Sequence, residues 1–527
     1  MTRTARAARL GILSLAMINI ASIVSARNLP VMAEYGWAML LLFLLSILVF
    51  LVPISMTAAE LGTGWPRAGG VYAWVKQAFG GRAGFLAVWC DYAENIAWFP
   101  TVLSFIAASL AYAINPSLAT NNVFLVVVML TFFWATTVAS LRGVRASAAI
   151  GAIGTVAGSI VPAILVVVLG AAYLLQGNPS QIPFSAGALV PDIELDNLAF
   201  LGGVILLFTG MEMAGFHARE TENPGRTVPR AIFLAVAVTV VFSVFGSLFM
   251  AFVLPQQEIS LVSGTMELFS SVLDKLSLGW LLAPLALVVA LGGVAHLAPW
   301  ILGPAKGVAT VAQEGLAPAG LGRTNRNDVP VPALIIQGIG GSVFALLFLF
   351  VPSVSTSYWM LSAVTAQVTI IMYALMFAAV IRLRYTRPET PRPYRIPGGR
   401  AGVWLVGGVG LLGCVASFLL GFIPPSQLKT GDTVVYVLLL ALASCGDATA
   451  ADRASATVAA TMTATSTAMS THSAPSARSC SCSTVIPTTT ATTGSPTVAA
   501  GSDAVRAPAW YADCCSSVPP PSAITIA

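Results

Sequence analysis

The chain has 527 residues, of which 57% are hydrophobic and only 9% are charged. A water-soluble protein of this size needs several times more charge to cover its surface, and the mean hydropathy here is +0.85. The composition therefore excludes a soluble globular protein. The seven cysteines show neither the spacing of a metal site nor a disulfide framework.

Repeated apolar segments of about 20 residues, each long enough to cross a hydrocarbon layer of about 30 Å, predict an all-α polytopic membrane protein. A further apolar stretch, 432–445, is too short to cross and would be an incomplete twelfth span. In chain order, the eleven predicted spans are residues 10–31, 36–60, 84–113, 122–141, 147–175, 198–218, 230–254, 279–302, 332–351, 356–381 and 402–423.

The distribution of lysine and arginine predicts the orientation. With residues 1–9 as a cytoplasmic N-terminus, the cytoplasmic segments contain 20 of the 26 Lys and Arg residues, and the external segments contain 2, Lys275 and Lys429. Positive residues accumulate in the cytoplasmic loops of membrane proteins. We therefore expect a multi-pass protein of the cell (inner) membrane.

The composition changes abruptly near Gly446. Residues 446–527 are rich in Ala, Thr and Ser, as in STVIPTTTATTGSPTVAAG, with little to bury in a core or a bilayer. Two interpretations stay open: a disordered tail, or the product of a reading-frame error. The position of the change, inside a would-be twelfth span just after TVVYVLLLALAS, favours the reading-frame error.

Two spans contain signs of a helix interruption. In FTGMEMAG (208–215), Glu212 lies between Gly210 and Gly215, and in the first span NIASIVSARNLP (19–30) combines small polar residues with an arginine and a proline. Backbone groups freed inside a bilayer are tolerated where they line a cavity or contact a ligand. Two such spans five helices apart predict an inverted repeat with a site near the middle of the membrane. Glu212 would hold the break or carry a proton; alternatively, it is a neutral, hydrogen-bonded acid that ties two helices together.

Other charged or titratable side chains also lie within spans, where a charge costs several kcal/mol and usually faces a cavity or a partner. Arg27 is a candidate for binding a substrate carboxylate, or it merely pairs with Asp91 or Glu94, which are three apart on one helix face. His296 can titrate near physiological pH or be a packing residue. Trp300, four residues later, fits an aromatic gate or ordinary packing.

Four stretches in order resemble the amino acid–polyamine–organocation (APC) superfamily of transporters over roughly residues 8–440. GWPRAGGVYAWVKQAFG (64–80) and NPGRTVPRA (223–231) resemble its loops after the second and sixth spans. The segment 303–334 resembles its connection between the eighth and ninth spans, and RPYRIPGG (392–399) resembles the approach to the eleventh. AHLAPWILGP in the eighth span and the NPGR segment after the sixth span are most similar to the bacterial glutamate/GABA antiporter group.

The resemblance implies a five-plus-five inverted-repeat core, the fold first seen in a leucine transporter, with additional C-terminal helices. Residues 10–175 would form the first repeat, 198–381 the second, and 402–445 the accessory spans. It also implies that substrate lies between unwound parts of the first and sixth spans. The implied substrate-binding residues are Ile23, Val24, Ser25, Arg27, Phe208, Thr209, Gly210, Met211, His296 and Trp300, with Glu212 at the family's acidic position.

Departures from the family pattern bear on the substrate. In the glutamate/GABA antiporters an aromatic residue stands at the position of Arg27 and an acidic residue at that of His296, and the glycines of the first-span motif are absent here. Arg27 would favour an anionic or neutral solute. The tail does not resemble the segment that plugs the cytoplasmic path of those antiporters, so gating by such a plug is not expected.

These observations predict an amino-acid transporter, an exchanger of the glutamate/GABA type that works by alternating access. A proton-coupled symporter and a nutrient receptor that does not transport are the alternatives. An enzyme is not expected, since the spans contain no paired catalytic aspartates, HExxH or nucleophile motif. We expect the lipid bilayer and a small amino acid as partners, with protons as a coupling ion, and no nucleic acid, cofactor or metal. The sequence does not predict the oligomeric state.

Overall fold

The computed structural model describes residues 10–66, 69–142, 154, 156–185, 187–190, 207–216, 221, 223–351, 353–423, 437 and 440. Within these ranges the chain forms helices and turns, with a single isolated bridge between Leu10 and Thr221. The prediction of an all-α polytopic fold is confirmed. The tail from residue 446 lies outside the described residues.

Nine helical segments of the described chain are long and apolar enough to cross a membrane, and a tenth is formed if the bent pair at the start counts as one span. The bent pair joins α1 (Ile12–Ile23) to Ala26–Ala33, which comprises η1 (Ala26–Asn28) and α2 (Leu29–Ala33). The nine are Gly36–Gly64 (which contains α3, Met39–Ser46, and α4, Val52–Gly64), α6 (Gly81–Ile114), α7 (Asn122–Ser140), Val156–Leu175 (with α9, Val161–Leu175), α13 (Pro224–Val253), Gly279–Gln313 (with α15, Leu282–Gln313), α16 (Val331–Phe350), α17 (Val354–Thr386) and α18 (Gly399–Leu420).

These ten segments correspond to ten of the eleven predicted spans. The sixth, 198–218, is described only over 207–216, and the incomplete twelfth, 432–445, only at residues 437 and 440. The fifth, 147–175, is described at residue 154 and from residue 156 onward. Hydropathy thus located each of these ten spans.

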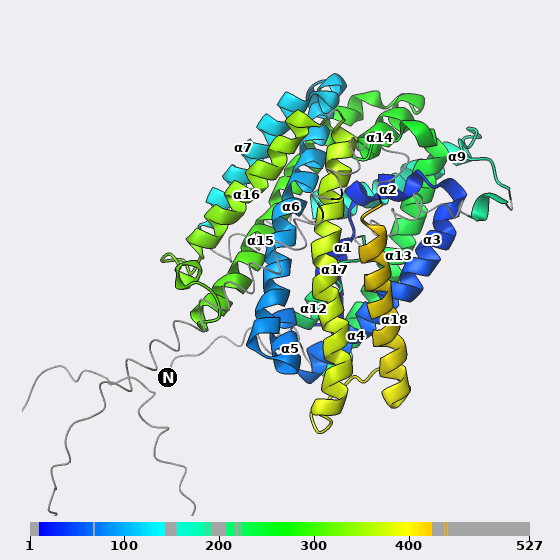
Figure 1. Ribbon diagram of the computed structural model, residues 1–527. Helices are drawn as coiled ribbons and strands as arrows, with labels where there is room; N and C mark the ends of the chain where they lie inside the picture. The colour runs from blue at the N-terminus through cyan, green and yellow to red at the C-terminus, as the bar shows by residue number, and fades with distance from the viewer. Residues whose placement is uncertain are drawn as a thin grey trace, which may run out of the picture. The chain divides into compact units, whose positions relative to one another are not determined.

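Two helices form the centre of the bundle. In the most apolar window of α17, 78% of the residues are buried, and in that of α6, 72% are, against 33% to 50% in the other spans. In Figure 1, α7, α15 and α16 lie on one side of α6 and α17, and α13, α18 and α3 lie on the other. The outer helices expose large apolar side chains such as Phe350 (80%) and Leu412 (70%), as expected of a surface that faces lipid rather than water.

A short helix, α5 (Gly70–Phe79), follows α4 and packs against α6, α17 and α12 (Met213–Phe216). The indole of Trp74 is fully buried, and a Cβ at Gly215 would lie 2.7 Å from its ring, so this close packing requires glycine at 215. Lys76 of α5 forms an ion pair of 2.6 Å with Glu314, just beyond α15. The helix α5 therefore connects the segment with the second predicted break to the two central helices, α6 and α17.

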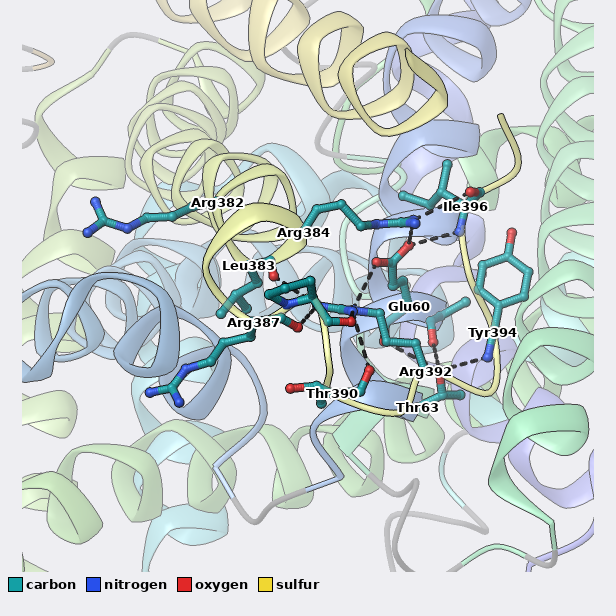
Figure 2. Close-up of polar contacts among 12 residues, drawn as sticks. Glu60, Thr63, Arg382, Leu383, Arg384, Arg387, Thr390, Arg392, Tyr394 and Ile396 are labelled. Carbon is teal, nitrogen blue, oxygen red and sulfur yellow. Dashed lines mark hydrogen bonds and ion pairs between the residues drawn. The ribbon is translucent and has the colours of Figure 1, made fainter. Parts of the chain in front are cut away.

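A buried carboxylate, Glu60, fastens the loop between α17 and α18 to the end of α4 (Figure 2). Its Oε2 atom accepts hydrogen bonds from Arg384 Nη2 at 2.5 Å and from the amide of Ile396 at 2.8 Å, and Oε1 lies 3.4 Å from Arg392 Nε. In Figure 2 the side chains of Arg382 and Arg387 point away from this carboxylate.

The second arginine of this network also completes the end of α17. Arg392 donates hydrogen bonds from Nη2 to the carbonyls of Leu383 (2.8 Å) and Arg387 (2.7 Å), which belong to the final turn and the C-cap, and its guanidinium lies 4.9 Å from the ring centre of Trp65. The last carbonyls of a helix have no partner within the helix, so this arginine supplies one. Glu60 balances the charge that this cap brings into a buried place.

We predict that Glu60→Gln destabilises the protein, because it leaves two buried guanidinium groups without a counter-charge. Loss of one partner from a buried ion pair costs about 3–5 kcal/mol, which corresponds to a clear fall in the midpoint of thermal unfolding of the detergent-solubilised protein. Asp328→Asn is the control, since Asp328 pairs with Lys306 at 3.4 Å but has an 81% exposed side chain. Equal midpoints for the two variants would contradict a stabilising role for Glu60.

Candidate functional site

The first span is broken between residues 23 and 26. The helix α1 ends at Ile23, and the backbone becomes extended at Val24 (φ −70°, ψ 113°) and Ser25 (φ −145°, ψ 130°) before η1 begins at Ala26. The two halves differ in direction by 40°. The interruption expected in NIASIVSARNLP is therefore present, and it leaves the last carbonyls of α1 without a continuing helix.

The predicted sixth span is also irregular where it is described. Residues 207–212 form turns, and the helix α12 begins only at Met213. Gly210 has φ +102°, a left-handed conformation that suits glycine. The break expected around Gly210 and Glu212 is thus present in residues 207–212, and the segment before it lies outside the described residues.

The two broken segments lie against each other. Asn19 Nδ2 of α1 donates a hydrogen bond to the carbonyl of Met211 at 3.1 Å, and a Cβ at Gly210 would lie 3.3 Å from Ile23 Cγ1. Between them is a pocket of about 60 Å³. Its lining comprises Ala21, Ser22, Ile23, Val24, Ser25, Arg27, Asn28, Glu94, Asn95, Trp98, Val102, Leu207, Thr209, His296 and Trp300.

Most of the candidate binding residues from the sequence line this pocket: Ile23, Val24, Ser25, Arg27, Thr209, His296 and Trp300. The other three are neighbours of the lining. Phe208 is fully buried and packs on Phe43 with ring centres 6.1 Å apart, Met211 accepts the bond from Asn19, and the amide of Gly210 contacts Tyr373. The structure thus brings the first and second candidate segments together at one place.

Glu212 lies behind the break, held by a tyrosine of α17. The hydroxyl of Tyr373 donates a hydrogen bond to Glu212 Oε2 at 2.8 Å and accepts one from the amide of Gly210 at 2.9 Å. One hydroxyl therefore joins the carboxylate, the broken backbone and the central helix. This arrangement suits both readings of Glu212, because it supports the break and also presents a buried carboxylate with a hydroxyl partner.

Arg27 is held by hydroxyl groups and aromatic rings. Its Nη1 atom donates to Thr101 Oγ1 at 2.9 Å and to the hydroxyl of Tyr358 at 3.2 Å, and the guanidinium carbon lies 5.7 Å from the ring centre of Trp98 and 5.8 Å from that of Tyr358. Arg27 is only 7% exposed, so it is a buried residue.

The carboxylates expected as partners of Arg27 do not pair with it. Among the described residues no ion pair within 4.0 Å joins Arg27 to Asp91 or Glu94. Glu94 instead accepts hydrogen bonds from Asn95 Nδ2 at 2.6 Å and from the hydroxyl of Thr369 at 3.3 Å, and it lines the pocket that Asp91 does not reach. Arg27 is therefore positioned by neutral groups in this structure.

Aromatic side chains close one wall of the pocket. Trp300 and His296 are four residues apart on α15, so they share a face of that helix. The ring of Trp300 lies 5.3 Å from that of Trp98 on α6. These tryptophans bring α6 and α15 together beside the guanidinium of Arg27.

A second cavity, of about 840 Å³, opens at the start of α17, whereas the Glu60 network lies at the end of the same helix. Glu34, Glu258 and Glu267 contribute its charged lining, together with the hydroxyls of Ser353 and Ser355. The cavity lies toward the same end of α17 as Tyr358, which contacts Arg27 from the first two turns of that helix.

Several residues with roles in this arrangement did not stand out in the sequence. Tyr373, Tyr358 and Thr101 are ordinary hydroxyl residues in apolar spans, and Glu60 falls at the last position of a predicted span. A hydroxyl or carboxyl in an apolar segment is a weak signal, because only contacts with distant helices show which charge it serves. For Glu60, the ion pairs with Arg384 and Arg392 become visible only in the structure, since those arginines are more than 300 residues away in the sequence.

Comparison with known proteins identifies the family. The model of the amino acid permease family matches residues 10–444. The chain belongs to the amino acid permease family. It is therefore an amino acid transporter and a multi-pass membrane protein, as the resemblance of its loops implied.

Individual relatives of this amino acid permease include transporters of different substrates. An uncharacterized transporter of Legionella pneumophila is 36% identical over 82% of this chain and 93% of the relative. A glutamate/gamma-aminobutyrate antiporter of Lactococcus lactis is 31% identical over 78% of this chain and 83% of the relative. A probable agmatine/putrescine antiporter of the same species is 24% identical over 69% of this chain and 78% of the relative.

We predict that Gly210→Ala destabilises this permease, because a side chain at φ +102° is strained and its Cβ approaches Ile23. A left-handed conformation costs an L-residue about 1–2 kcal/mol. The control is Gly408→Ala in α18, where a Cβ would meet nothing within 4 Å, so its thermal midpoint should be unchanged or raised. A Gly210→Ala protein as stable as the Gly408→Ala protein would show that residue 210 lies in ordinary helix.

Proposed function

We propose that this permease exchanges amino acids across the cell membrane by alternating access, in the manner of a glutamate/γ-aminobutyrate antiporter. The observation that carries the proposal is the meeting of two interrupted segments at one pocket, with residues 21–25 on one side and Leu207 and Thr209 on the other. The relatives described as glutamate/gamma-aminobutyrate antiporters support the exchange reaction, at 30–31% identity.

The broken segments suit recognition of a zwitterion. Peptide groups released from a helix in the middle of a membrane need partners, and a bound amino acid supplies a carboxylate and an ammonium group. In this proposal the backbone of residues 23–25 and 208–211 holds those groups. Arg27, His296 and Trp300 shape the space for the remainder of the substrate.

The same proposal assigns the chain two inverted repeats, residues 10–175 and 198–381, followed by accessory spans in 402–445. The first span of each repeat would then contribute one break to the shared pocket. Alternating access would expose the pocket to the two sides in turn, with a cytoplasmic N-terminus as the distribution of Lys and Arg predicts.

A proton-coupled symporter is the second candidate, and the buried carboxylates favour it. Asp91 and Glu94 on α6 and Glu212 behind the break form no ion pair with a Lys or Arg among the described residues. A carboxylate without a cationic partner inside a membrane is a common place for a transported proton.

Reconstituted vesicles distinguish the two reactions. We predict that uptake of a labelled amino acid, chosen from a competition panel, requires an unlabelled amino acid inside the vesicle and continues without a pH gradient. Uptake into empty vesicles driven by a pH gradient alone would contradict exchange and support the symporter. A protein that binds amino acids yet never moves them would contradict both.

We predict that Glu212→Gln lowers the transport rate at least tenfold while protein abundance falls less. Glutamine keeps an acceptor for Tyr373 but cannot bind or release a proton, so the loss would be in the transport cycle rather than in folding. Rates are normalised to the amount of protein in the vesicles. Parallel losses of rate and abundance would instead indicate that Glu212 only ties the helices together.

A further inference from the structure

The end of α17, the start of α18 and the loop between them carry more positive charge than the fold neutralises. Residues 382–400 contain six arginines and a single acidic residue, Glu389, which is exposed. Glu60 pairs with two of the arginines, Arg384 and Arg392. The other four are exposed and form no ion pair with a described residue: Arg382, Arg387, Arg395 and Arg400. Four exposed arginines against one exposed glutamate leave this surface with a net charge of +3.

One of these arginines, Arg400, lies against a pair of aromatic side chains. Its guanidinium carbon is 5.2 Å from the ring centre of Tyr385, whose hydroxyl accepts a hydrogen bond from Trp404 Nε1 at 2.9 Å. Tyr385 is 45% exposed and Trp404 is 54% exposed. Tyr and Trp side chains accumulate where a membrane protein passes the lipid headgroups. The three residues therefore mark the level at which α17 and α18 leave the hydrocarbon layer.

An exposed apolar stripe on α18 begins at this group. Four large side chains of the helix are exposed at a spacing that places them on one face: Trp404, Leu412, Val415 and Leu419. Arg400 precedes Trp404 by about one turn and lies on the same side. In Figure 1 the loop that joins α17 to α18 lies at the lower end of both helices, and α18 extends upward from it. A lipid whose acyl chains lie along this face therefore has its phosphate next to Arg400.

The guanidinium of Arg400 has donors to offer an anion. It makes no hydrogen bond to a described residue, so its N–H groups remain available beside the Tyr385 ring. Phosphate oxygens accept two parallel hydrogen bonds from such a group. Arg400 also lies in the first turn of α18, which contains no acidic residue and where the helix dipole disfavours a positive charge. A phosphate bound to Arg400 offsets that repulsion.

Charge selects the class of lipid. The headgroup of phosphatidylethanolamine has no net charge, and its ammonium group would face a surface with a net charge of +3. An anionic headgroup, such as that of phosphatidylglycerol, complements the same surface. Arginines close to a membrane surface attract anionic lipids, and the distribution of Lys and Arg predicts that this end of the bundle is cytoplasmic. The complementary lipid is therefore an anionic one in the cytoplasmic leaflet.

We propose that the surface formed by Tyr385, Arg400 and Trp404 is a binding site for an anionic glycerophospholipid. Arg400 binds the phosphate, the two aromatic rings contact the glycerol region, and the acyl chains lie along the exposed stripe of α18. The other exposed arginines add attraction at longer range. The bound lipid joins the start of α18 to the end of α17, beside the loop that Glu60 fastens to α4. This site is distinct from the pocket between the breaks and does not depend on the proposed function.

Native mass spectrometry of the purified full chain, delipidated in a neutral detergent, tests this proposal. We expect phosphatidylglycerol to bind roughly tenfold or more tightly than phosphatidylethanolamine with the same acyl chains. One arginine beside an anionic lipid contributes about fivefold to the affinity, so Arg400→Gln should weaken phosphatidylglycerol by about that factor and phosphatidylethanolamine by less. Arg326→Gln, at an exposed arginine in the loop after α15, is the matched control and should change neither.

Equal affinities for the two lipids would overturn the proposal, and so would an Arg400→Gln protein that binds phosphatidylglycerol as tightly as the Arg326→Gln protein does. Arg400→Lys keeps the charge and guards against misfolding, so it should retain the preference for phosphatidylglycerol at reduced affinity. Inorganic phosphate is the competing probe, and it should displace the lipid far less effectively than added phosphatidylglycerol. Displacement by inorganic phosphate as effective as that by phosphatidylglycerol would show a site for free phosphate and refute the lipid assignment.

Discussion

The structure depends on one constraint: a backbone amide or carbonyl inside a bilayer must find a partner within the protein or its ligand, because an unpaired group costs several kcal/mol. Long helices satisfy it over most of the described chain. The exceptions are Val24–Ser25 and residues 207–212, which lie against each other; Val24, Ser25, Leu207 and Thr209 line one pocket. In the proposed function, a small polar solute bound where they meet completes the missing hydrogen bonds.

The buried charged residues are likewise held by partners within the protein, at three places along the bundle. At the end of α4, Glu60 is neutralised by two arginines that also fasten the loop after α17. Behind the second break, Glu212 is held by the hydroxyl of Tyr373, which also contacts the broken backbone. Within the pocket, Arg27 is supported only by neutral oxygens and rings. A counter-charge is therefore present at the Glu60 network and absent at Arg27, where the proposed solute would bind, and α17 contributes to all three places.

The sequence predicted the spans and both interruptions, because hydropathy and the glycine, proline and small polar residues that interrupt a helix act over a few neighbouring residues. It did not predict how Arg27 is held: Asp91 and Glu94 were equally plausible by type and spacing, and only the packing of α6 and α17 brings Thr101 and Tyr358 to the guanidinium. Phe208, Gly210 and Met211 were expected to contact substrate, whereas the structure places them just behind the lining. These details depend on contacts between residues hundreds of positions apart, which no local pattern encodes.

Hydrogen–deuterium exchange with and without a bound amino acid tests the central claim most directly, since it reports on the backbone amides themselves. If the breaks bind the solute, amides in residues 23–28 and 207–213 exchange more slowly when it is present, while those of outer helices such as α16 and α18 are unchanged. Exchange at the two breaks that is already as slow as in the long helices and does not respond to a solute that binds would contradict the account.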